Sequence, residues 1–493
     1  DEFFELVLEE AIHYSNADAG SLYTVSDDKK FLDFQFVCTL SKNIRLGRAD
    51  ISRWPSVPLY EKNGNKNLKN FVSYVFHTKE STHIDDVYNQ DIFDNSGTKK
   101  YDSANNYHSK SMVAIPLKNH ENEVLGVIQL INSIDHHFEI VPFNKEHITM
   151  LTSLASQAAI ALTNKKLIKG LENLLYQFIK VIASAIDKKS KFTGGHIARV
   201  ANLTELITHK IQKDNNYFKN VRFSDEEIQE ISMAGWMHDI GKITTPVYIM
   251  DKATKLETIF DRIELIKTRY ELLKLILENE KISNKDNSSK KSIEKTLSQL
   301  EEDWVFLQKT NKEPEFLKKE DIDRIERIFQ FNYEYRGKKY FLISENEKNN
   351  LSIQKGTLLN EEMEKMRDHV MVTHDMLSQL SFPVKFKNVP LYASSHHEKL
   401  NGKGYPFKLT EEKMPLQSRI IAVADIFESL TASDRPYKKG KTLSETLKIL
   451  AHTARDNEID KDILTLLLDS GLFLKYAKEN LKPEQIDDVE IEK

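Results

Sequence analysis

Two adjacent histidines followed by a carboxylate lead into a glycine-spaced turn in the C-terminal part of the chain. The stretch extends from His396 to Pro406 and reads HHEKLNGKGYP. Neutral imidazoles are the commonest metal ligands, and two side by side can serve two ions or two positions on one ion. Gly402 and Gly404 allow positive φ and a close approach to a ligand, and Pro406 stiffens the exit. The stretch predicts a metal site, although an exposed loop with incidental histidines would show the same letters.

Four further segments supply metal-ligand side chains on or beside predicted helices. His196 opens an apolar-periodic helix, and the HDIGK motif of residues 238–242 follows a helical pattern that begins near Ser224. Five imidazoles and two carboxylates are enough for two metal ions with positions left open for water and substrate. A donor set without sulfur suits iron, manganese or zinc. The complete candidate set is His196, His238, Asp239, His369, His396, His397 and Asp425.

These motifs, in this order, resemble the HD-GYP subgroup of HD-domain phosphohydrolases. The resemblance covers roughly residues 170–470 and rests on HxxRV, HDIGK, the third histidine, HHExxxGxGYP and the later aspartate. It implies that the seven residues bind two divalent ions, with iron or manganese preferred and zinc as the alternative. It also implies cyclic di-GMP as the substrate, with pGpG, GMP or both as the product.

Asp239 and Lys242 are the candidate catalytic residues. Consecutive helical residues point about 100° apart, so His238 and Asp239 reach one cluster only if it lies against the helix flank. Asp239 can then bridge two cations, holding them about 3.5–4 Å apart. Lys242 lies one turn away and is placed to neutralise the scissile phosphate, with a plain surface lysine as the alternative.

The resemblance also implies which residues hold the nucleotide. Arg435 can stack on guanine and bond its edge in a plane, and Lys438 supplies a point charge. The glycines let the loop approach the nucleotide. The implied substrate-binding set is Lys242, Gly402, Gly404, Tyr405, Pro406, Arg435 and Lys438.

Several polar residues near these motifs are predicted to have other roles. Thr193 is interpreted as a helix-start cap and Arg199 as an ion-pair partner on the helix flank. The pair His374 and Asp375 repeats the HD letters without the following Gly-Lys. Five residues of helix rotate it away from His369, so we expect it at the surface or behind the ligands.

The expected number of metals is two per chain. Some family members hold a third metal through a carboxylate four residues before the first histidine, where this chain has Phe192. Ser190 is no better suited, and Asp187 is the nearest carboxylate. A third dication without a charged ligand would leave excess positive charge. We expect the ligands to divide into two groups, with Asp239 between them: His196, His238, Asp239 and Asp425 around one ion, and His369, His396 and His397 around the other.

Length and composition set the broad class of the protein. The 493 residues predict two or three domains, and the net charge of -5 disfavours a polymeric nucleic acid as partner. The single cysteine, Cys38, lies in an apolar strand-like run and fits inert core in a reducing cytoplasm. No apolar run approaches the ~18 residues that span a bilayer. We expect a cytoplasmic protein, although a segment before Asp1 could add a membrane anchor.

Residues 1–144 predict an α+β sensor-like domain. An amphipathic helix over 1–18 precedes alternating strands, and the polar segment 89–110 is predicted to be a long loop that lids a ligand pocket. The strands 111–117 and 125–132 resemble those of a GAF domain. Its partner is an unknown small ligand or protein. Cyclic nucleotides are disfavoured because the Asn-Lys-Phe-Asp-Glu pattern is missing.

A proline-free apolar pattern predicts one continuous helix over 145–187. At about 1.5 Å per residue it is longer than one domain needs. We expect it to connect the domains and to pair with its copy in a parallel homodimer. A helix lying back on its own domains is the alternative.

The all-α HD-GYP catalytic domain is predicted over 188–255 and 351–493, interrupted by an insertion over 256–350. Helices at 256–282 and 292–309, with a polar turn between them, predict an antiparallel hairpin. The insertion serves oligomer contacts or regulation, or is a passive appendage.

Three functions compete on the sequence alone. The first is a regulated cyclic di-GMP phosphodiesterase, favoured because the ligand set and the GYP triplet are complete. The second is a receptor that binds the dinucleotide without hydrolysing it. The third is an HD hydrolase of a hybrid cyclic dinucleotide.

Overall fold

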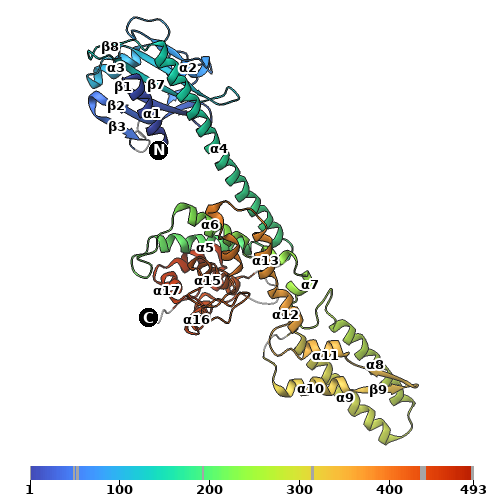
Figure 1. Ribbon diagram of the computed structural model, residues 1–493. Coiled ribbons are helices and arrows are strands. Elements are labelled where there is room, and N and C mark those ends of the chain that lie inside the picture. Colours follow the sequence, from blue (N-terminus) through green and yellow to red (C-terminus); the bar gives the residue numbers. More distant parts are fainter. Residues whose placement is uncertain are drawn as a thin grey trace. The chain divides into compact units, whose positions relative to one another are not determined.

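The structure is a computed structural model, and it describes residues 2–47, 50, 55–190, 194–312, 316–433 and 440–489. The chain divides into two compact units, residues 1–174 and 175–493. The first is an α+β unit and the second is helical apart from one small hairpin (Figure 1). The predicted fold class, a sheet-containing sensor-like domain followed by a helical domain with an inserted segment, is confirmed.

One antiparallel sheet forms the centre of the N-terminal unit. Its strands follow the order β3-β2-β1-β7-β6-β5, while β4 pairs with β2 and β8 with β7. The strand bounds are β1 Ala17–Val25, β2 Phe31–Thr39, β3 Ile44–Gly47, β4 Val57–Pro58, β5 Thr82–Ile84, β6 Met112–Lys118, β7 Val124–Ile134 and β8 Ile140–Val141.

The two faces of this sheet carry different layers because side chains alternate along each strand. Helix α1 (Glu2–Ser15) and the first turns of α4 pack their apolar residues on one face. Helix α2 (Phe71–Thr78) covers part of the other face. Cys38 is buried in the first layer, where burial raises the pKa of its thiol. It lies in the sheet core as predicted.

The polar segment 89–110 contains a helix, so the prediction of a continuous loop is wrong. Helix α3 runs over Ser96–Asn105 and has little apolar surface. Asp94 accepts a hydrogen bond from the first-turn amide of Ser96. The buried Asp102 accepts bonds from Tyr88 and from both the amide and the hydroxyl of Ser109. These polar contacts hold the helix in place, and a hydrophobic pattern cannot reveal them.

Helix α4 spans Lys145–Asp187, the range in which the sequence pattern predicted a continuous helix. Its first half is buried in the N-terminal unit through Leu151 and Ala155. Its last turns are buried in the second unit through Ile179, Ala183 and Ile186.

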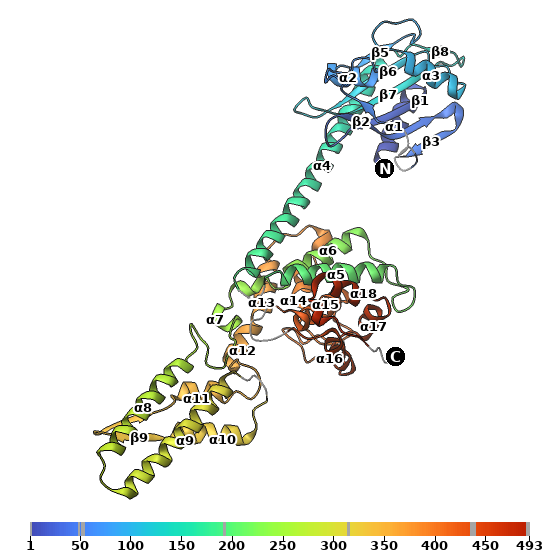
Figure 2. The ribbon, with the colours of Figure 1, turned by 180° about the vertical axis from the view of Figure 1, so that it is seen from behind.

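The helices of the second unit surround two apolar cores. One lies between α5 and α15–α18, and the other joins the end of α4 to α6, α13 and α14 (Figure 2). The helix bounds are α5 His196–Gln212, α6 Asp225–Met237, η2 Ile240–Ile243, α7 Val247–Met250, α12 Asn360–Arg367, α13 His369–Ser378, η3 Val384–Phe386, α14 Val389–Ser394, α15 Leu416–Thr431, α16 Leu443–Arg455, α17 Lys461–Asp469, α18 Leu472–Asn480 and η4 Pro483–Gln485.

The inserted segment has an apolar core of its own, with residues between Leu256 and Leu351. It contains the helices α8 (Ile263–Ser283) and α9 (Asn287–Lys312), which pack together as the hairpin pattern predicted. The first helix begins seven residues after its predicted start at 256. The second begins five residues before its predicted start at 292, so part of the expected polar turn is helical. The remaining elements are α10 Lys319–Gln330, β9 Asn332–Tyr335, β10 Lys338–Phe341 and α11 Glu345–Leu351.

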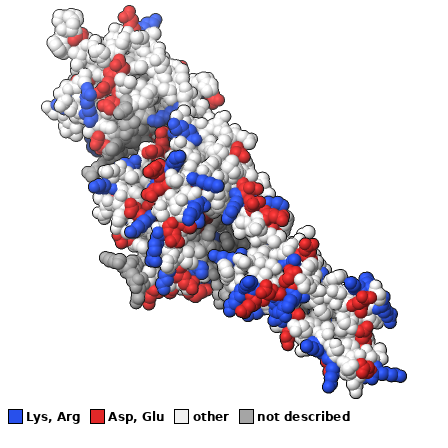
Figure 3. Space-filling model, turned by 60° about the horizontal axis from the view of Figure 1, so that its bottom comes forward, with Lys and Arg blue, Asp and Glu red and all other residues white. Residues whose placement is uncertain are grey.

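The surface is charged but mixed in sign. On the face shown in Figure 3, Lys and Arg side chains are interspersed with Asp and Glu. Among the described residues, no helix combines the length and the apolar character that crossing a bilayer requires.

Candidate metal centre

The HDIGK motif lies where one helix ends and a tighter one begins. Helix α6 starts after Ser224, whose hydroxyl and the Glu227 carboxylate form a reciprocal capping box. It ends at Met237, so His238 follows as the C-cap and Asp239 precedes the 3-10 helix η2. This break lets the consecutive side chains of His238 and Asp239 reach one buried cluster.

Four other helical segments bring the remaining candidates to the same place. His196 is the first residue of α5, His369 is the first residue of α13, and Asp425 lies within α15. His396 and His397 follow the C-terminus of α14. All seven candidates from the sequence are therefore brought together, and six of them are buried.

The first group of ligand atoms surrounds one oxygen of Asp239. Oδ2 of Asp239 lies 3.4 Å from Nε2 of His196 and 3.3 Å from Nε2 of His238. Oδ1 of Asp425 lies 3.4 Å from the same nitrogen of His196. Two atoms that bind the same metal ion at about 2.1 Å lie at such a distance from each other.

The second group faces the other oxygen of Asp239. Oδ1 of Asp239 lies 3.3 Å from Nε2 of His369 and 4.0 Å from Nε2 of His396. The His397 ring is 4.1 Å from the His396 ring, measured between centroids. Ligand atoms of His369, His396 and His397 all lie within 4.8 Å of one another.

Three histidines are each oriented by a backbone carbonyl of the helix that precedes them or that they cap. Nδ1 of His238 donates to the carbonyl of Gly235 at 2.8 Å, and Nδ1 of His396 donates to that of Ala393 at 2.6 Å. His369 makes the same bond to the carbonyl three residues earlier. Each bond leaves Nε2 as the lone-pair nitrogen directed to the centre, which is the tautomer a metal requires.

Glu428 orients the fourth histidine and was missed from the sequence. Its carboxylate accepts from Nδ1 of His196 and, on the other oxygen, from Nε of Arg199 at 2.6 Å. Arg199 is thus an ion-pair partner, as predicted. The only sequence signal for Glu428 is its position three residues after Asp425, on the same face of α15.

The HDIGK glycine is required by the packing of η2 against α13. A Cβ at Gly241 would come within 1.9 Å of the His369 carbonyl oxygen. The hydroxyl of Thr373 accepts from the Gly241 amide at 3.0 Å and donates to the His238 carbonyl at 3.2 Å. These contacts fix His369 relative to His238 and Asp239.

Burial and neighbouring charges shift the pKa values of the candidate ligands in different directions. Burial lowers the pKa of His396 well below its ordinary value and that of His397 to about 4. Burial also opposes ionisation of Asp239, but Lys242 and the histidines outweigh it and hold its pKa well below the usual range. His396 and His397 are therefore neutral at neutral pH, and Asp239 is ionised. At His196 and His238 burial also opposes protonation, but the neighbouring carboxylates outweigh it and raise the pKa of both imidazoles above the ordinary value.

The donor set passes a test for metal binding that does not depend on family resemblance. Nε2 of His238, His369 and His396 and Oδ1 of Asp239 are buried without a hydrogen bond to any described residue. An unpaired buried polar atom costs about 1–3 kcal/mol, so four in one cluster indicate a site that accommodates cations. The residues present fit divalent metal ions.

Lys242 lies at the edge of this centre. Its Nζ is 2.6 Å from Oδ2 of Asp239, and its side chain is partly exposed. Lys189, just after α4, donates to the backbone carbonyls of Lys242, Ile243 and Thr245. The end of the long helix is thereby tied to the segment that carries Lys242.

The GYP loop is shaped by the buried carboxylate of Glu398. Its oxygens accept bonds from the amides of Phe407, Lys408 and Leu409. Gly402 has φ +72, as the sequence indicated. Gly404 does not take positive φ. A Cβ there would come within 2.4 Å of the Glu398 Cα, so this glycine is required by the loop's own backbone.

Tyr405 brings this loop into contact with His397, one of the candidate metal ligands. Its ring stacks on His397 at 5.0 Å between centroids, and the Arg367 guanidinium lies 5.5 Å above it. The following Tyr405-Pro406 bond is cis. The predicted substrate residues Arg435 and Lys438, and the predicted cap Thr193, lie outside the described residues.

Two residues discussed as alternatives lie outside the ligand groups. His374 bonds to Ser394 and contacts the Phe407 ring, while Asp375 is exposed. Asp187 is buried and accepts from the backbone amide of Ile197, next to His196. Burial raises the pKa of Asp187 to about 6.

Comparison with protein families finds a domain match in each of the two units. Residues 1–162 match the GAF domain family, so the match extends past the predicted boundary into α4. Two HD domain families match residues 193–330 and 346–463. Together these matches cover the segments that carry all seven metal-ligand candidates.

Curated relatives are similar to this chain over short segments. A 3'3'-cGAMP-specific phosphodiesterase of Vibrio cholerae is 35% identical over 130 residues, 25% of this chain and 27% of that protein. The cyclic di-GMP phosphodiesterase response regulator RpfG of Xanthomonas campestris is 38% identical over 99 residues, 20% of this chain and 25% of that protein. A cyclic di-GMP phosphodiesterase of Thermotoga maritima is 36% identical over 96 residues, 20% of this chain and 26% of that protein.

The chain thus matches only about a quarter of the length of these relatives. The family matches identify the domains: this chain combines an N-terminal GAF domain with a C-terminal HD domain.

Proposed function

We propose that the chain is a metal-dependent phosphodiesterase that hydrolyses cyclic di-GMP to pGpG, GMP or both, regulated by its GAF domain. The main support for the proposal is the position of the Asp239 carboxylate, which directs one oxygen towards each histidine group. The names of the similar proteins support the substrate class.

The seven clustered residues are the proposed ligands of two divalent ions, with iron or manganese preferred over zinc because of the family resemblance. When bound, the two ions lower the pKa of water and neutralise charge on the phosphodiester. The chain's part is to fix the geometry. Asp239 spans both groups, while Glu428 and the helix carbonyls hold the imidazoles in the required tautomer.

Lys242 is the proposed electrophilic residue for the scissile phosphate. Its ammonium lies beside the centre but on the partly exposed side, where it can bond a phosphate oxygen without displacing a ligand. Tyr405 and its GYP loop, with Gly402, Gly404 and Pro406, are the proposed floor for the nucleotide. Arg435 and Lys438 stay predictions for guanine and phosphate contacts.

A hybrid cyclic dinucleotide is the second candidate substrate. One similar protein is named as specific for 3'3'-cGAMP, and it shares the longest matched segment of the three relatives. A receptor that binds without hydrolysis is disfavoured by the complete ligand set and by Lys242.

The test is turnover by the anaerobically purified chain, with cyclic di-GMP and 3'3'-cGAMP compared at equal concentration. We expect linear products from cyclic di-GMP at the higher kcat/KM. A higher value for 3'3'-cGAMP would assign the hybrid substrate. Binding without product from either would support the receptor.

We further propose a parallel homodimer through α4. Five apolar residues follow one another at alternating steps of four and three, and each is more than half exposed: Leu167, Leu171, Leu174, Phe178 and Val181. This is the 3.5-residue repeat of a coiled coil, and Asn164 continues it towards the N-terminus at a position where a polar residue selects the register.

A further inference from the structure

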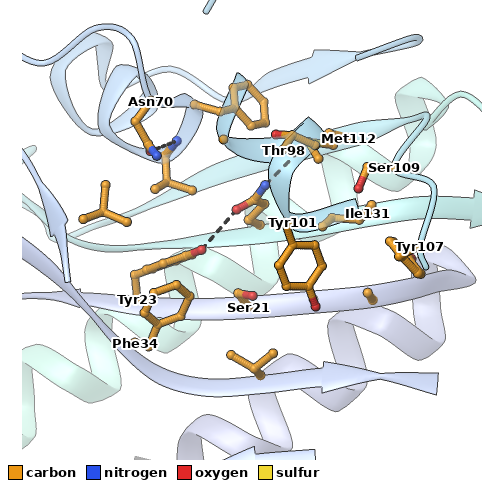
Figure 4. Close-up of a pocket in the computed structure, with 18 of the residues that line it drawn as sticks. Ser21, Tyr23, Phe34, Asn70, Thr98, Tyr101, Tyr107, Ser109, Met112 and Ile131 are labelled. Carbon is orange, nitrogen blue, oxygen red and sulfur yellow. Dashed lines mark hydrogen bonds between the residues drawn. The ribbon is translucent and has the colours of Figure 1, made fainter. Parts of the chain in front are cut away.

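The GAF unit contains a cavity of ≈ 580 Å³ on the sheet face opposite α1 and α4. Strands β1, β2, β6 and β7 contribute its floor, and α2 and α3 contribute its sides (Figure 4). The volume suits a small organic molecule. Six aromatic side chains from separate elements line it: Tyr23, Phe34, Phe71, Phe93, Tyr101 and Tyr107.

The floor carries uncharged hydrogen-bonding groups at its centre. The Tyr23 hydroxyl donates to Oε1 of Gln129 at 3.2 Å, the bond drawn dashed from Tyr23 in Figure 4. Nε2 of Gln129 is 3.5 Å from the sulfur of Met112, which is a weak acceptor. Ser21 lies opposite Gln129 in the β1–β7 pairing. The amide therefore has donor capacity left, beside hydroxyl groups that can donate or accept.

The walls formed by described residues offer little positive charge. Among the described lining residues there is no Lys, Arg or His, and Asp94 is the one charged side chain. Two helices begin at the cavity. Asn70 accepts from two first-turn amides of α2, and Asp94, an anion itself, accepts from the Ser96 amide of α3. A phosphate or carboxylate would lose its hydration without gaining a cation, which costs several kcal/mol.

Two other ligand classes fit less well. The described lining contains neither a cysteine nor a histidine, so it lacks the side chains that attach or axially bind a tetrapyrrole. A cation would find aromatic faces, but Asp94 is exposed and already bonds the Ser96 amide at 2.9 Å. Gln129 and Tyr23, deeper in the cavity, are neutral acceptors and donors.

We propose that this cavity binds a neutral, planar heteroaromatic molecule of one or two rings whose edge carries both a donor and an acceptor. The ring stacks among the aromatic side chains, with Tyr101 from α3 at the mouth and Tyr23 and Phe34 at the floor. The ring edge bonds the carboxamide of Gln129, which presents a donor and an acceptor in one plane.

Hypoxanthine is a suitable probe, because it is neutral at pH 7 and carries adjacent N–H and C=O groups. Inosine 5'-monophosphate adds an anionic phosphate to the same ring system, and choline represents the cationic class. Binding to the intact chain is measured by saturation-transfer difference NMR and calorimetry, together with neutral one- and two-ring heteroaromatics of similar size. These readouts do not depend on phosphodiesterase activity.

Two variants localise the binding to the cavity. Gln129→Leu removes the carboxamide at similar volume, and Tyr23→Phe removes one hydroxyl and keeps the ring. Each is expected to weaken binding about tenfold. Gln35→Leu is the matched control, because Gln35 is buried in the same sheet but does not line the cavity. A probe bound at the metal centre would be unaffected by all three.

The expected result is saturable binding of hypoxanthine or a similar neutral ring, weakened about tenfold in both cavity variants and unchanged in the control. Equal or tighter binding of the monophosphate would overturn the proposal, as would preferential binding of choline. Failure of every neutral heteroaromatic to bind at millimolar concentration would also overturn it. If Gln129→Leu fails to fold, Tyr23→Phe decides.

Discussion

Asp239 is the residue on which the electrostatic balance of the centre depends. It is 2% exposed and faces four imidazoles and one ammonium. A carboxylate buried this deeply is stable only when it is paired with cations or hydrogen-bond donors. Its neighbour Lys242 supplies one positive charge from the partly exposed side. Of these two residues, only Asp239 is a proposed metal ligand.

The first prediction separates these two roles. Asp239→Ala and His396→Ala should each lower the bound metal and abolish hydrolysis, because each removes a proposed direct ligand. Lys242→Ala should retain the metal and lose about 10²–10³-fold in kcat, the usual effect of losing one charge-stabilising group. Metal analysis and turnover on the same preparations check this. Normal turnover in Lys242→Ala would remove its assigned role.

Glu428 provides the second prediction. Glu428→Gln should weaken metal binding about 10–100-fold, because the carboxylate that orients His196 and balances Arg199 is lost. Competition with a chelator of known affinity measures this. Glu479→Gln on the exposed face of α18 is the control. If both variants bind metal like the parent chain, Glu428 has no part in holding His196.

At the scale of single residues, the sequence predicted the candidate ligands but not the residues that position them. The histidines and aspartates stand in recognisable motifs, and the structure brings them together. Glu428 and Thr373 act through atoms of other helices, and their partners are known only once α15 and α13 are packed. Gly404 shows the same limit, because its constraint comes from the Glu398 backbone.

Helix α4 is the element that reaches from the GAF unit to the HD unit, and its C-terminal end contacts the segments that carry His196 and Lys242. Asp187, its last residue, accepts from the amide of Ile197 at the start of α5. Lys189, two residues on, donates three bonds to the carbonyls of η2 and the residues after it. A shift or rotation of the helix end would therefore move the His196 and Lys242 segments.

The third prediction tests this connection. Lys189→Met should lower turnover while leaving the bound metal unchanged, because the segment that carries Lys242 loses the three hydrogen bonds donated by Lys189. Lys188→Met is the control, since Lys188 is exposed. A loss confined to kcat would support a positioning role. Equal turnover in both variants would show that the anchor is dispensable.

Elements with a strong apolar period were predictable, and those held by polar contacts were not. The 43-residue α4 and the α8–α9 pair follow such periods. Helix α3 depends on the hydrogen bonds of Asp102, so its composition indicated a loop.

For the whole molecule, the exposed stripe on α4 leads to the fourth prediction. Leu171→Glu should convert the proposed dimer into a monomer, because it places a charge in the centre of the apolar seam. Lys169→Glu changes charge on the same helix away from the stripe and should leave the dimer intact. Sedimentation at micromolar concentration measures both. A monomeric parent chain would rule out the dimer.

The most direct test of the account is an anomalous difference map of crystals grown from anaerobically purified protein. We predict two peaks per chain about 3.5–4 Å apart, one beside each oxygen of Asp239. The first should contact His196, His238 and Asp425, and the second should contact His369, His396 and His397. A single peak, or none, would contradict the two-metal centre. Three closely spaced peaks would contradict the predicted count and make Asp187 the first residue to examine.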